Sequence, residues 1–157
     1  MQFTIKHLVG VAVVAATAAA PLAPAAAGHS DRRCAQRFDA AQRQDMESFR
    51  DFKADEWRAV HDTEAISIDP SGKAAYGIEQ IMAGAKTHFE RKWAIWSWTE
   101  LSRRVDGCRT AVIVYDATYD IPSIDYHQRA LTTVTYTYKH GHWLGVLDQG
   151  TYLDAPS

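Results

Sequence analysis

Residues 129–151 read RALTTVTYTYKHGHWLGVLDQGT. The first half is rich in Thr, Val and Tyr, which are enriched in strands, and it predicts one long strand from Tyr126 to Tyr138. His140-Gly141 closes this strand with a turn, and a last strand follows from Trp143 to Tyr152. Two strands joined by a tight turn predict an antiparallel hairpin at the end of the domain.

Further strands are predicted upstream of this hairpin. Residues 93–105 alternate between apolar and polar side chains, and Asp106-Gly107 is a hairpin turn signal. In residues 110–119 the odd-numbered positions are apolar or aromatic, so one face of that strand is expected to be buried. Earlier, residues 65–68 predict a short strand, which the turn at residues 69–72 (DPSG) ends.

Helical spacing dominates the rest of the chain. Residues 31–58 repeat apolar side chains every three to four positions, and residues 55–61 predict a second, short helix. Residues 76–92 form a third amphipathic pattern. Helices followed by antiparallel strands predict an α+β fold, with three N-terminal helices packed on one face of an antiparallel sheet.

The first 27 residues read MQFTIKHLVGVAVVAATAAAPLAPAAA. A short basic start, an apolar run of about a dozen residues and a small-residue cleavage site are typical of a secretory signal peptide. Residues 28–157 would then form a single domain. We therefore expect a secreted or periplasmic protein that does not associate with a membrane after cleavage.

The chain holds two cysteines, Cys34 and Cys108. Outside the cytosol, a pair of cysteines is more often a disulfide than two free thiols. Neither cysteine has a histidine or a second cysteine at metal-ligand spacing. We therefore predict a Cys34–Cys108 disulfide.

Charge and motif content exclude several functions. Lys and Arg number 17 against 19 Asp and Glu, a net charge of −2, so there is no basic excess to bind nucleic acid. The sequence has no phosphate loop, no dinucleotide fingerprint and no HExxH motif, and His140-Gly141-His142 falls in a turn. No cofactor and no metal are expected.

The order of elements resembles the nuclear transport factor 2-like superfamily. The likeness rests on IDPSGKAAYGIEQI, residues 68–81, and on the strand-turn-strand of residues 129–151. The superfamily includes ketosteroid isomerases, SnoaL-like polyketide cyclases and the association domain of calmodulin-dependent kinase II. The resemblance implies a curved sheet that wraps around the helices and leaves a conical cavity. It does not identify the reaction, because this fold hosts many functions.

The Asp69-Pro70 turn is similar to the position of the general base in ketosteroid isomerases. There the base acts with an oxyanion hole made of a Tyr and a protonated Asp. In this chain those two partners fall near Asp45 and Val134, so steroid isomerisation is not supported. The alternative is that Asp69 only opens a turn, as Asp often does.

A second set of candidates comes from polar and aromatic residues that could face the cone. Trp96 and Trp98 are two apart and share a face of their strand. A buried Arg needs a partner, so the resemblance implies an inward Arg129 paired with Asp148. The residues expected to bind the ligand are Trp57, His61, Tyr76, Trp96, Trp98, Tyr115, Arg129, Asp148 and Gln149.

Three functions remain open. The leading hypothesis is an exported protein that binds a small apolar or aromatic molecule in an aromatic-lined pocket. The second is an isomerase, cyclase or hydratase with Asp69 or His88 as the catalytic base. The third is an interaction module without catalysis. A homodimer is also predicted, because superfamily members commonly pair through the outer sheet face, where Thr133, Thr135 and Thr137 would lie.

Overall fold

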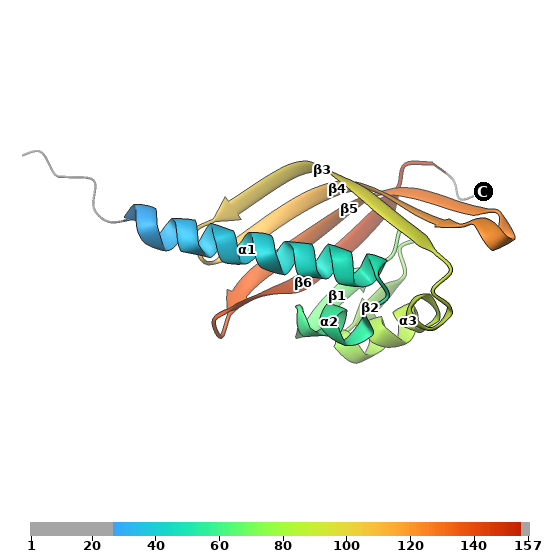
Figure 1. The fold of residues 1–157 in the computed structure, drawn as a ribbon, viewed down its shortest axis with the longest axis horizontal. Coiled ribbons are helices and arrows are strands. Elements are labelled where there is room, and N and C mark those ends of the chain that lie inside the picture. Colours follow the sequence, from blue (N-terminus) through green and yellow to red (C-terminus); the bar gives the residue numbers. More distant parts are fainter. Residues whose placement is uncertain (1–26, 155–157) are drawn as a thin grey trace, which may run out of the picture.

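The computed structural model describes residues 27–154, and side chains from residue 33. A curved six-stranded sheet wraps around a long helix, with two shorter helices at one end (Figure 1). In chain order the elements are α1 (Ala27–Arg50), α2 (Ala54–Ala59), β1 (His61–Ile68), β2 (Ala74–Tyr76), α3 (Ile78–Arg91), β3 (Ile95–Asp106), β4 (Thr110–Ile121), the 3-10 turn η1 (Pro122–Ile124), β5 (Tyr126–Lys139) and β6 (His142–Tyr152). The α+β class is therefore confirmed.

The sheet order is β2-β1-β6-β5-β4-β3. The β3–β6 meander is antiparallel, as predicted, but β1 pairs with β6 in parallel. The prediction of a wholly antiparallel sheet was wrong, because β1 and β6 are not joined by a hairpin that would fix their direction. Strand β2 was not predicted either, because a strand of three residues is too short for its side chains to show an alternating pattern. Strands β1 and β2 lie between α2 and α3, so the helices do not all precede the sheet.

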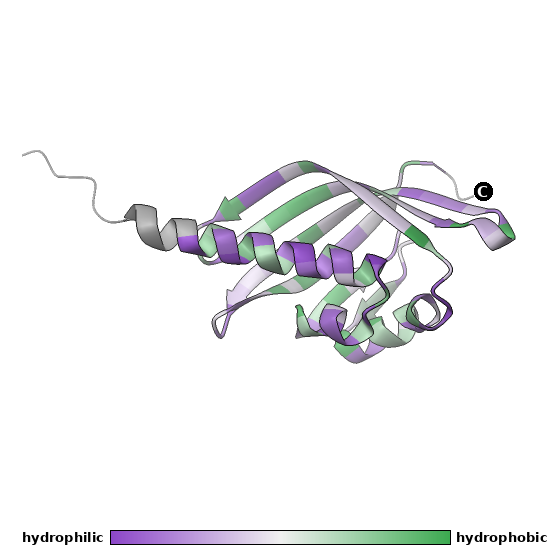
Figure 2. Ribbon diagram, in the orientation of Figure 1, coloured by the Kyte–Doolittle hydropathy of each residue, from purple (hydrophilic) through white to green (hydrophobic). Residues whose placement is uncertain are grey.

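Helix α1 lies along the concave face of the sheet because one of its faces is apolar (Figure 2). Phe38 is completely buried and meets the rings of Tyr136 and Trp143 edge-on, with centroids 5.2 and 5.1 Å away. On β4, the side chains of Ala111, Ile113, Tyr115 and Ala117 are buried and alternate with half-buried ones, as predicted. These side chains form the larger of two core clusters.

The smaller cluster lies where α2 and α3 cover the other end of the sheet. It contains Trp57, Ala65, Ile81 and Phe89, with Phe49 of α1 packed against it. The predicted apolar stripe of the third helix supplies Ile81 and Phe89. Between the two clusters, the helices and the sheet do not fully fill the cone, and that gap holds the candidate site described below.

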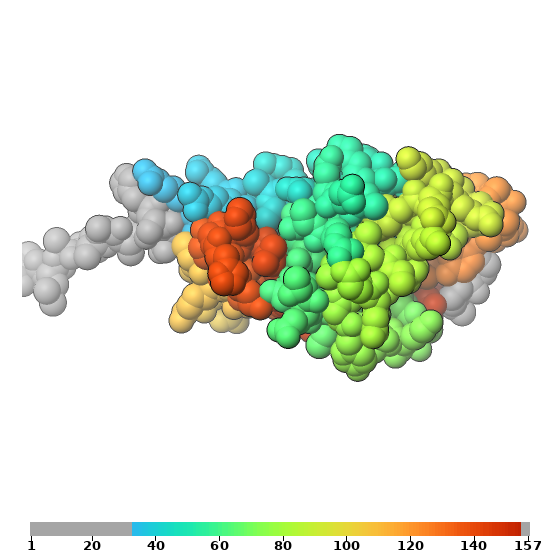
Figure 3. All heavy atoms as spheres, turned by 90° about the horizontal axis from the view of Figure 1, so that it is seen from below, coloured from blue at the N-terminus to red at the C-terminus, as the bar shows by residue number. Residues whose placement is uncertain are grey.

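The N-terminal half of α1 is fastened to the sheet at two hairpin tips. Cys34 and Cys108 form a disulfide with Cα atoms 5.5 Å apart, which confirms the predicted pairing. At the other tip, Trp143 Nε1 donates a hydrogen bond to the carbonyl oxygen of Cys34 at 3.2 Å, and the β5–β6 hairpin lies against α1 in the space-filling view (Figure 3).

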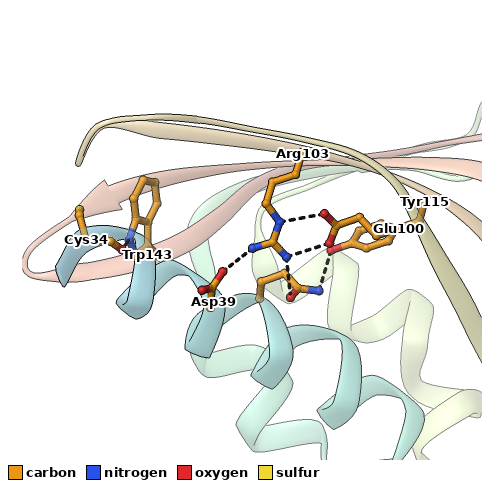
Figure 4. Close-up of polar contacts among 7 residues, drawn as sticks. Cys34, Asp39, Glu100, Arg103, Tyr115 and Trp143 are labelled. Atoms are coloured by element: carbon orange, nitrogen blue, oxygen red, sulfur yellow. Dashed lines mark hydrogen bonds and ion pairs between the residues drawn. The ribbon is translucent and has the colours of Figure 1, made fainter. Parts of the chain in front are cut away.

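A polar network adds a third attachment further along α1 (Figure 4). Arg103 of β3 forms ion pairs with Asp39 and Glu100, and its guanidinium donates to Gln42 Oε1 at 3.3 Å. Gln42 Nε2 in turn donates to the hydroxyl of the fully buried Tyr115 at 2.8 Å. Helix α1 is therefore held in register along the sheet by polar contacts as well as by packing.

The predicted signal peptide, residues 1–27, lies outside the described residues except for Ala27, where α1 begins. Within residues 27–154, no helix combines the length and apolar character that crossing a membrane requires.

We expect reduction of the disulfide to destabilise the domain. The bond closes a loop across 74 residues of sequence, and the chain-entropy model assigns about 4 kcal/mol to such a loop. Adding a thiol reductant should lower the melting temperature by several degrees. The double variant Cys34→Ser/Cys108→Ser is the control, and its melting curve should not respond to reductant. An unchanged curve for the natural protein, together with two titratable thiols, would contradict this expectation.

Candidate functional site

The candidate site is a cavity of about 210 Å³ between α1, α2 and the concave face of the sheet. Helix α1, the β1–β2 turn and strands β1 and β3 to β6 all contribute side chains to it. The lining residues are Asp45, Met46, Phe49, Trp57, His61, Ser67, Ile68, Asp69, Pro70, Trp96, Ala117, Tyr119, Gln128, Ala130, Thr132, Val134, Asp148 and Gly150.

One wall of the cavity is aromatic. Phe49 of α1 lies at its centre, with ring centroids 5.4 Å from Trp57 and 5.5 Å from Trp96. Tyr119 extends the wall, 6.3 Å from Trp96. Trp96 Nε1 is buried and has no hydrogen-bond partner among the described residues. The wall therefore offers several ring faces to the cavity.

His88 supports this wall from behind. Its ring stacks on Phe49 with centroids 3.9 Å apart. Nε2 lies 2.7 Å from the carbonyl oxygen of Phe49 and must donate to it, so Nδ1, 3.0 Å away, accepts from the Tyr119 hydroxyl. Burial lowers the pKa of His88, which favours this neutral form. His88 does not line the cavity, and its geometry fits a positioning role rather than the predicted catalytic base.

The floor of the cavity is polar and acidic. Asp45 is buried at 4% exposure and accepts a hydrogen bond from the Tyr136 hydroxyl at 2.5 Å. Its other oxygen, Oδ1, lies 3.8 Å from His61 Nε2, too far for a hydrogen bond. His61 Nδ1 donates to the carbonyl oxygen of Trp57 at 2.7 Å, which leaves Nε2 directed at the carboxylate. Asp148 completes the floor from β6.

Asp148 is the most perturbed carboxyl group of the site. Burial, reinforced by the negative charge of Asp45, raises the pKa of Asp148 to about 7, although His61 acts in the opposite direction. No hydrogen bond to this carboxyl group comes from any described residue. None of the lining residues is Lys or Arg, so the floor has two carboxyl groups and one imidazole but no fixed positive charge.

The Asp69-Pro70 turn forms part of the rim. Asp69 Oδ1 accepts hydrogen bonds from Ser71 N at 2.8 Å, Ser71 Oγ at 2.5 Å and Lys73 N at 3.1 Å. Burial pushes the pKa of Asp69 upward, but these hydrogen bonds outweigh it and the pKa is lowered. A low pKa and a fully engaged oxygen favour the turn-forming role of Asp69 over that of a general base.

Pro70 packs against β6, and this contact requires glycine at position 150. A Cβ atom on Gly150 would lie 2.6 Å from Pro70 Cγ, well inside van der Waals contact. The predicted Asp-Pro turn thus closes one side of the cavity through a backbone contact. The turn therefore shapes the rim of the cavity.

Five of the predicted site residues meet in the cavity and six do not. Those that line it are Trp57, His61, Asp69, Trp96 and Asp148, while Tyr76, His88, Trp98, Tyr115, Arg129 and Gln149 do not. Tyr76 is 62% exposed on β2, and Tyr115 is buried beneath α1 in the Gln42 network. Trp98 packs in the larger core with Arg50 over its ring, because its strand passes under α1 beyond the cavity.

The predicted Arg129–Asp148 pair was wrong. Arg129 is exposed and binds Asp116 of β4, at 2.9 Å from Nε and 2.6 Å from Nη2. Its neighbour Ala130 lines the cavity, so Arg129 must lie on the opposite face of β5. The same alternation places Gln149 outside, next to the inward Asp148.

The most important residue that the sequence analysis missed as a site residue is Asp45. A signal was present, because Asp45 follows the buried Phe38 by seven positions and precedes Phe49 by four, which places it on the apolar stripe of α1. A carboxylate on the buried face of a helix is rare enough to mark a candidate site. Phe49 and Tyr119, which belong to the apolar patterns of residues 31–58 and 110–119, also line the cavity.

The fold is similar to that of several solved structures. A nuclear transport factor 2-like protein of unknown function from Shewanella oneidensis matches with a TM-score of 0.63 and 13% identity, over 74% of this chain and 98% of that one. A protein described as a calcium/calmodulin-dependent protein kinase type II association domain, from Thiobacillus denitrificans, matches with a TM-score of 0.63 and 18% identity, over 74% and 94%. An uncharacterised cystatin-like-fold protein from Caulobacter vibrioides gives 0.65 and 11%, over 78% and 92%.

These likenesses establish a nuclear transport factor 2-like cone fold, in agreement with the resemblance noted in the sequence. No protein-family model matches the sequence. No curated protein matches it either. Similarity to solved structures therefore establishes the fold, whereas the activity depends on the residues that line the cavity.

The raised pKa of Asp148 predicts an unusual pH dependence of stability. In the unfolded chain this carboxyl group loses its proton near pH 4, whereas in the folded protein it holds the proton to about pH 7. The free energy of unfolding should therefore fall by roughly 1–4 kcal/mol between pH 4 and pH 7 on account of this group.

The variant Asp148→Asn isolates this effect. The lowered pKa of His88 acts in the opposite sense near pH 6, but it is common to both proteins and cancels in the difference. Urea denaturation at pH 5 and pH 8 should show Asp148→Asn gaining stability relative to the natural protein as the pH rises. A constant difference between the two proteins would mean that Asp148 titrates normally.

Proposed function

We propose that this chain is an exported protein that binds a small, one-ring organic molecule in its cone cavity. The observation that carries the proposal is the aromatic wall over an acidic floor, enclosed in one cavity of about 210 Å³. Sites for drug-sized ligands run from about 300 Å³ upward, so this cavity suits a smaller molecule. Four-ring steroids are accordingly not proposed.

The wall supports binding rather than simple core packing. Well-packed cores leave few voids larger than a water molecule. Here Phe49, Trp57, Trp96 and Tyr119 surround a space that would hold several waters. Part of this lining is polar, because the carboxyl groups of Asp45 and Asp148 border the same space. A module whose cone is filled by its own side chains would present neither feature.

Export is part of this proposal. It is supported by the signal-like sequence of residues 1–27 and by the disulfide, which is characteristic of oxidising compartments. Secretion or delivery to a periplasm would place the cavity where it meets molecules from outside the cell.

The second candidate function is catalysis by proton transfer. It would use residues other than Asp69 and His88, the two bases predicted from the sequence. His61, Asp45 and Asp148 converge on the cavity floor, and the pKa of about 7 for Asp148 suits an acid or base at neutral pH. An isomerase, cyclase or hydratase would use this floor rather than Asp69 or His88. Binding of the substrate in the same cavity is common to both candidates.

Ligand binding is testable through tryptophan fluorescence. Trp57 and Trp96 line the cavity, so a one-ring aromatic compound that binds there should quench emission and raise the melting temperature. Trp96→Phe should lose a large part of the quenching. Trp93→Phe is the matched control, because Trp93 stacks with Arg91 and does not line the cavity. Equal loss of quenching in both variants would locate the compound elsewhere.

For the outer face of the sheet we propose a second copy of the chain as the partner. The helices cover the concave face, and the outer face carries half-buried Val112, Val114 and Leu131 among threonines. Light scattering at micromolar concentration should give the mass of a dimer, and Val114→Lys should reduce it to that of a monomer. Ser123→Lys in η1 controls for added charge. A monomer mass for the natural protein would contradict this assembly.

A further inference from the structure

We infer that the molecule bound in the cavity carries a basic nitrogen, and that its ammonium group lies between Asp45 and Asp148. This inference rests on the proposed binding function and deepens it by naming the ligand class, a one-ring organic amine. It follows from a count of the hydrogen-bond donors and acceptors that face the cavity.

The floor presents unsatisfied acceptors. Asp45 Oδ1 lies 3.8 Å from its nearest basic neighbour, His61 Nε2, and accepts no hydrogen bond from the described residues. The Asp148 carboxyl group accepts none either. A buried carboxylate without a partner is costly, by several kcal/mol. A ligand that brings positive charge and N–H donors to this floor would relieve that cost.

The neighbouring donors are already committed away from the cavity. The Tyr136 hydroxyl donates its proton to Asp45 Oδ2, and the Nδ1–H group of His61 donates to the carbonyl oxygen of Trp57. The Tyr119 hydroxyl proton goes to His88 Nδ1, since His88 Nε2 must donate to Phe49. The protons that these three side chains donate are therefore not available to a ligand.

The donors that remain among the lining residues are uncharged. They are the hydroxyl groups of Ser67 and Thr132, the amide of Gln128, and the Asp148 carboxyl group while it holds its proton, which it loses near pH 7. With no Lys or Arg in the lining, a carboxylate or phosphate ligand would meet two carboxyl groups and no fixed positive charge. The electrostatics therefore oppose anions and favour cations.

The aromatic wall fits the same ligand. An ammonium group is attracted to the face of Trp or Tyr at distances up to about 6 Å from the ring. Trp57 lies over His61, with centroids 4.3 Å apart, so one indole borders the acidic floor directly. The ammonium group of such a ligand would have carboxyl oxygens as hydrogen-bond partners and an aromatic face beside it. The ring of the ligand would pack on Phe49 and Trp96.

Three matched probes test the ligand class: benzylamine, benzyl alcohol and benzoate, titrated by calorimetry at pH 7.5 and low salt. They share one ring and differ in charge. We expect benzylamine to bind about tenfold or more tightly than benzyl alcohol, because charge-assisted hydrogen bonds are the stronger ones. Benzoate should not bind. Alcohol or benzoate binding as tightly as the amine would overturn this inference and leave the proposed binding function standing, whereas binding of none of the three would overturn both.

Variants locate the interaction. Asp148→Asn should weaken benzylamine about tenfold and leave benzyl alcohol nearly unchanged, and Asp45→Asn should act in the same direction. Glu90→Gln, on the exposed face of α3, removes the same charge far from the cavity and should have no effect. Melting curves check that each variant is folded. Equal weakening of the amine and the alcohol in Asp148→Asn would contradict a charge-specific role.

The pH dependence provides a test without any variant. Asp148 faces Asp45 of α1, His61 of β1 and Tyr136 of β5, and an ammonium group would compete with the proton on this floor. The affinity for benzylamine should therefore rise from pH 6 to pH 8, while the affinity for benzyl alcohol stays flat. A flat profile for both compounds would overturn the placement of the amine between the two carboxyl groups.

Discussion

The packing of α1 against the concave face of the sheet determines where the core forms and where the cavity remains. From Phe38 the helix buries apolar side chains against Tyr136 and Trp143, and a disulfide and the Arg103 network fix its position along the sheet. Two turns later the helix presents Asp45 to the cavity, while the neighbouring Met46 still packs in the larger core. The cavity lies beside this carboxylate, between the two core clusters, and Met46 and Phe49 of the same helix also line it.

Tyr136 couples the two halves of the molecule. Its ring packs on Phe38 in the dry core, and its hydroxyl donates to Asp45 at the edge of the cavity. The orientation of Asp45 is thus set by a residue that the core holds rigidly, and Gly145, whose Cβ would lie 3.1 Å from His61 Cδ2, leaves room for the imidazole opposite. A site built on such rigid elements is preorganised. The cost is that the carboxyl groups of Asp45 and Asp148 are held in the cavity without a Lys or Arg partner.

Much of the fold followed from local patterns in the sequence, and most of the site did not. The alternation of β4, the hairpin turns and the cysteine pair are local signals, and the structure agrees with them. The parallel β1–β6 pairing depends on contacts between two segments that are far apart in the sequence, which no local period reports. The site errors had a simpler cause: alternation places Arg129 on the same face as Thr133 and Thr135, outside the cone, although the resemblance suggested an inward Arg.

The position of Asp45 also explains why the resemblance to ketosteroid isomerases does not extend to their chemistry. In those enzymes, a Tyr and a protonated Asp donate hydrogen bonds to a developing oxyanion. In this chain the two corresponding positions hold Asp45, whose carboxylate accepts hydrogen bonds, and Val134, which has no polar group. The Asp69-Pro70 turn is present and forms part of the rim. One donor position thus holds an acceptor and the other an apolar side chain, so the donor pair that stabilises an oxyanion in those enzymes has no counterpart at these positions. The proposed preference for a cation follows from this change at Asp45 together with Asp148, which adds a second carboxyl group to the floor.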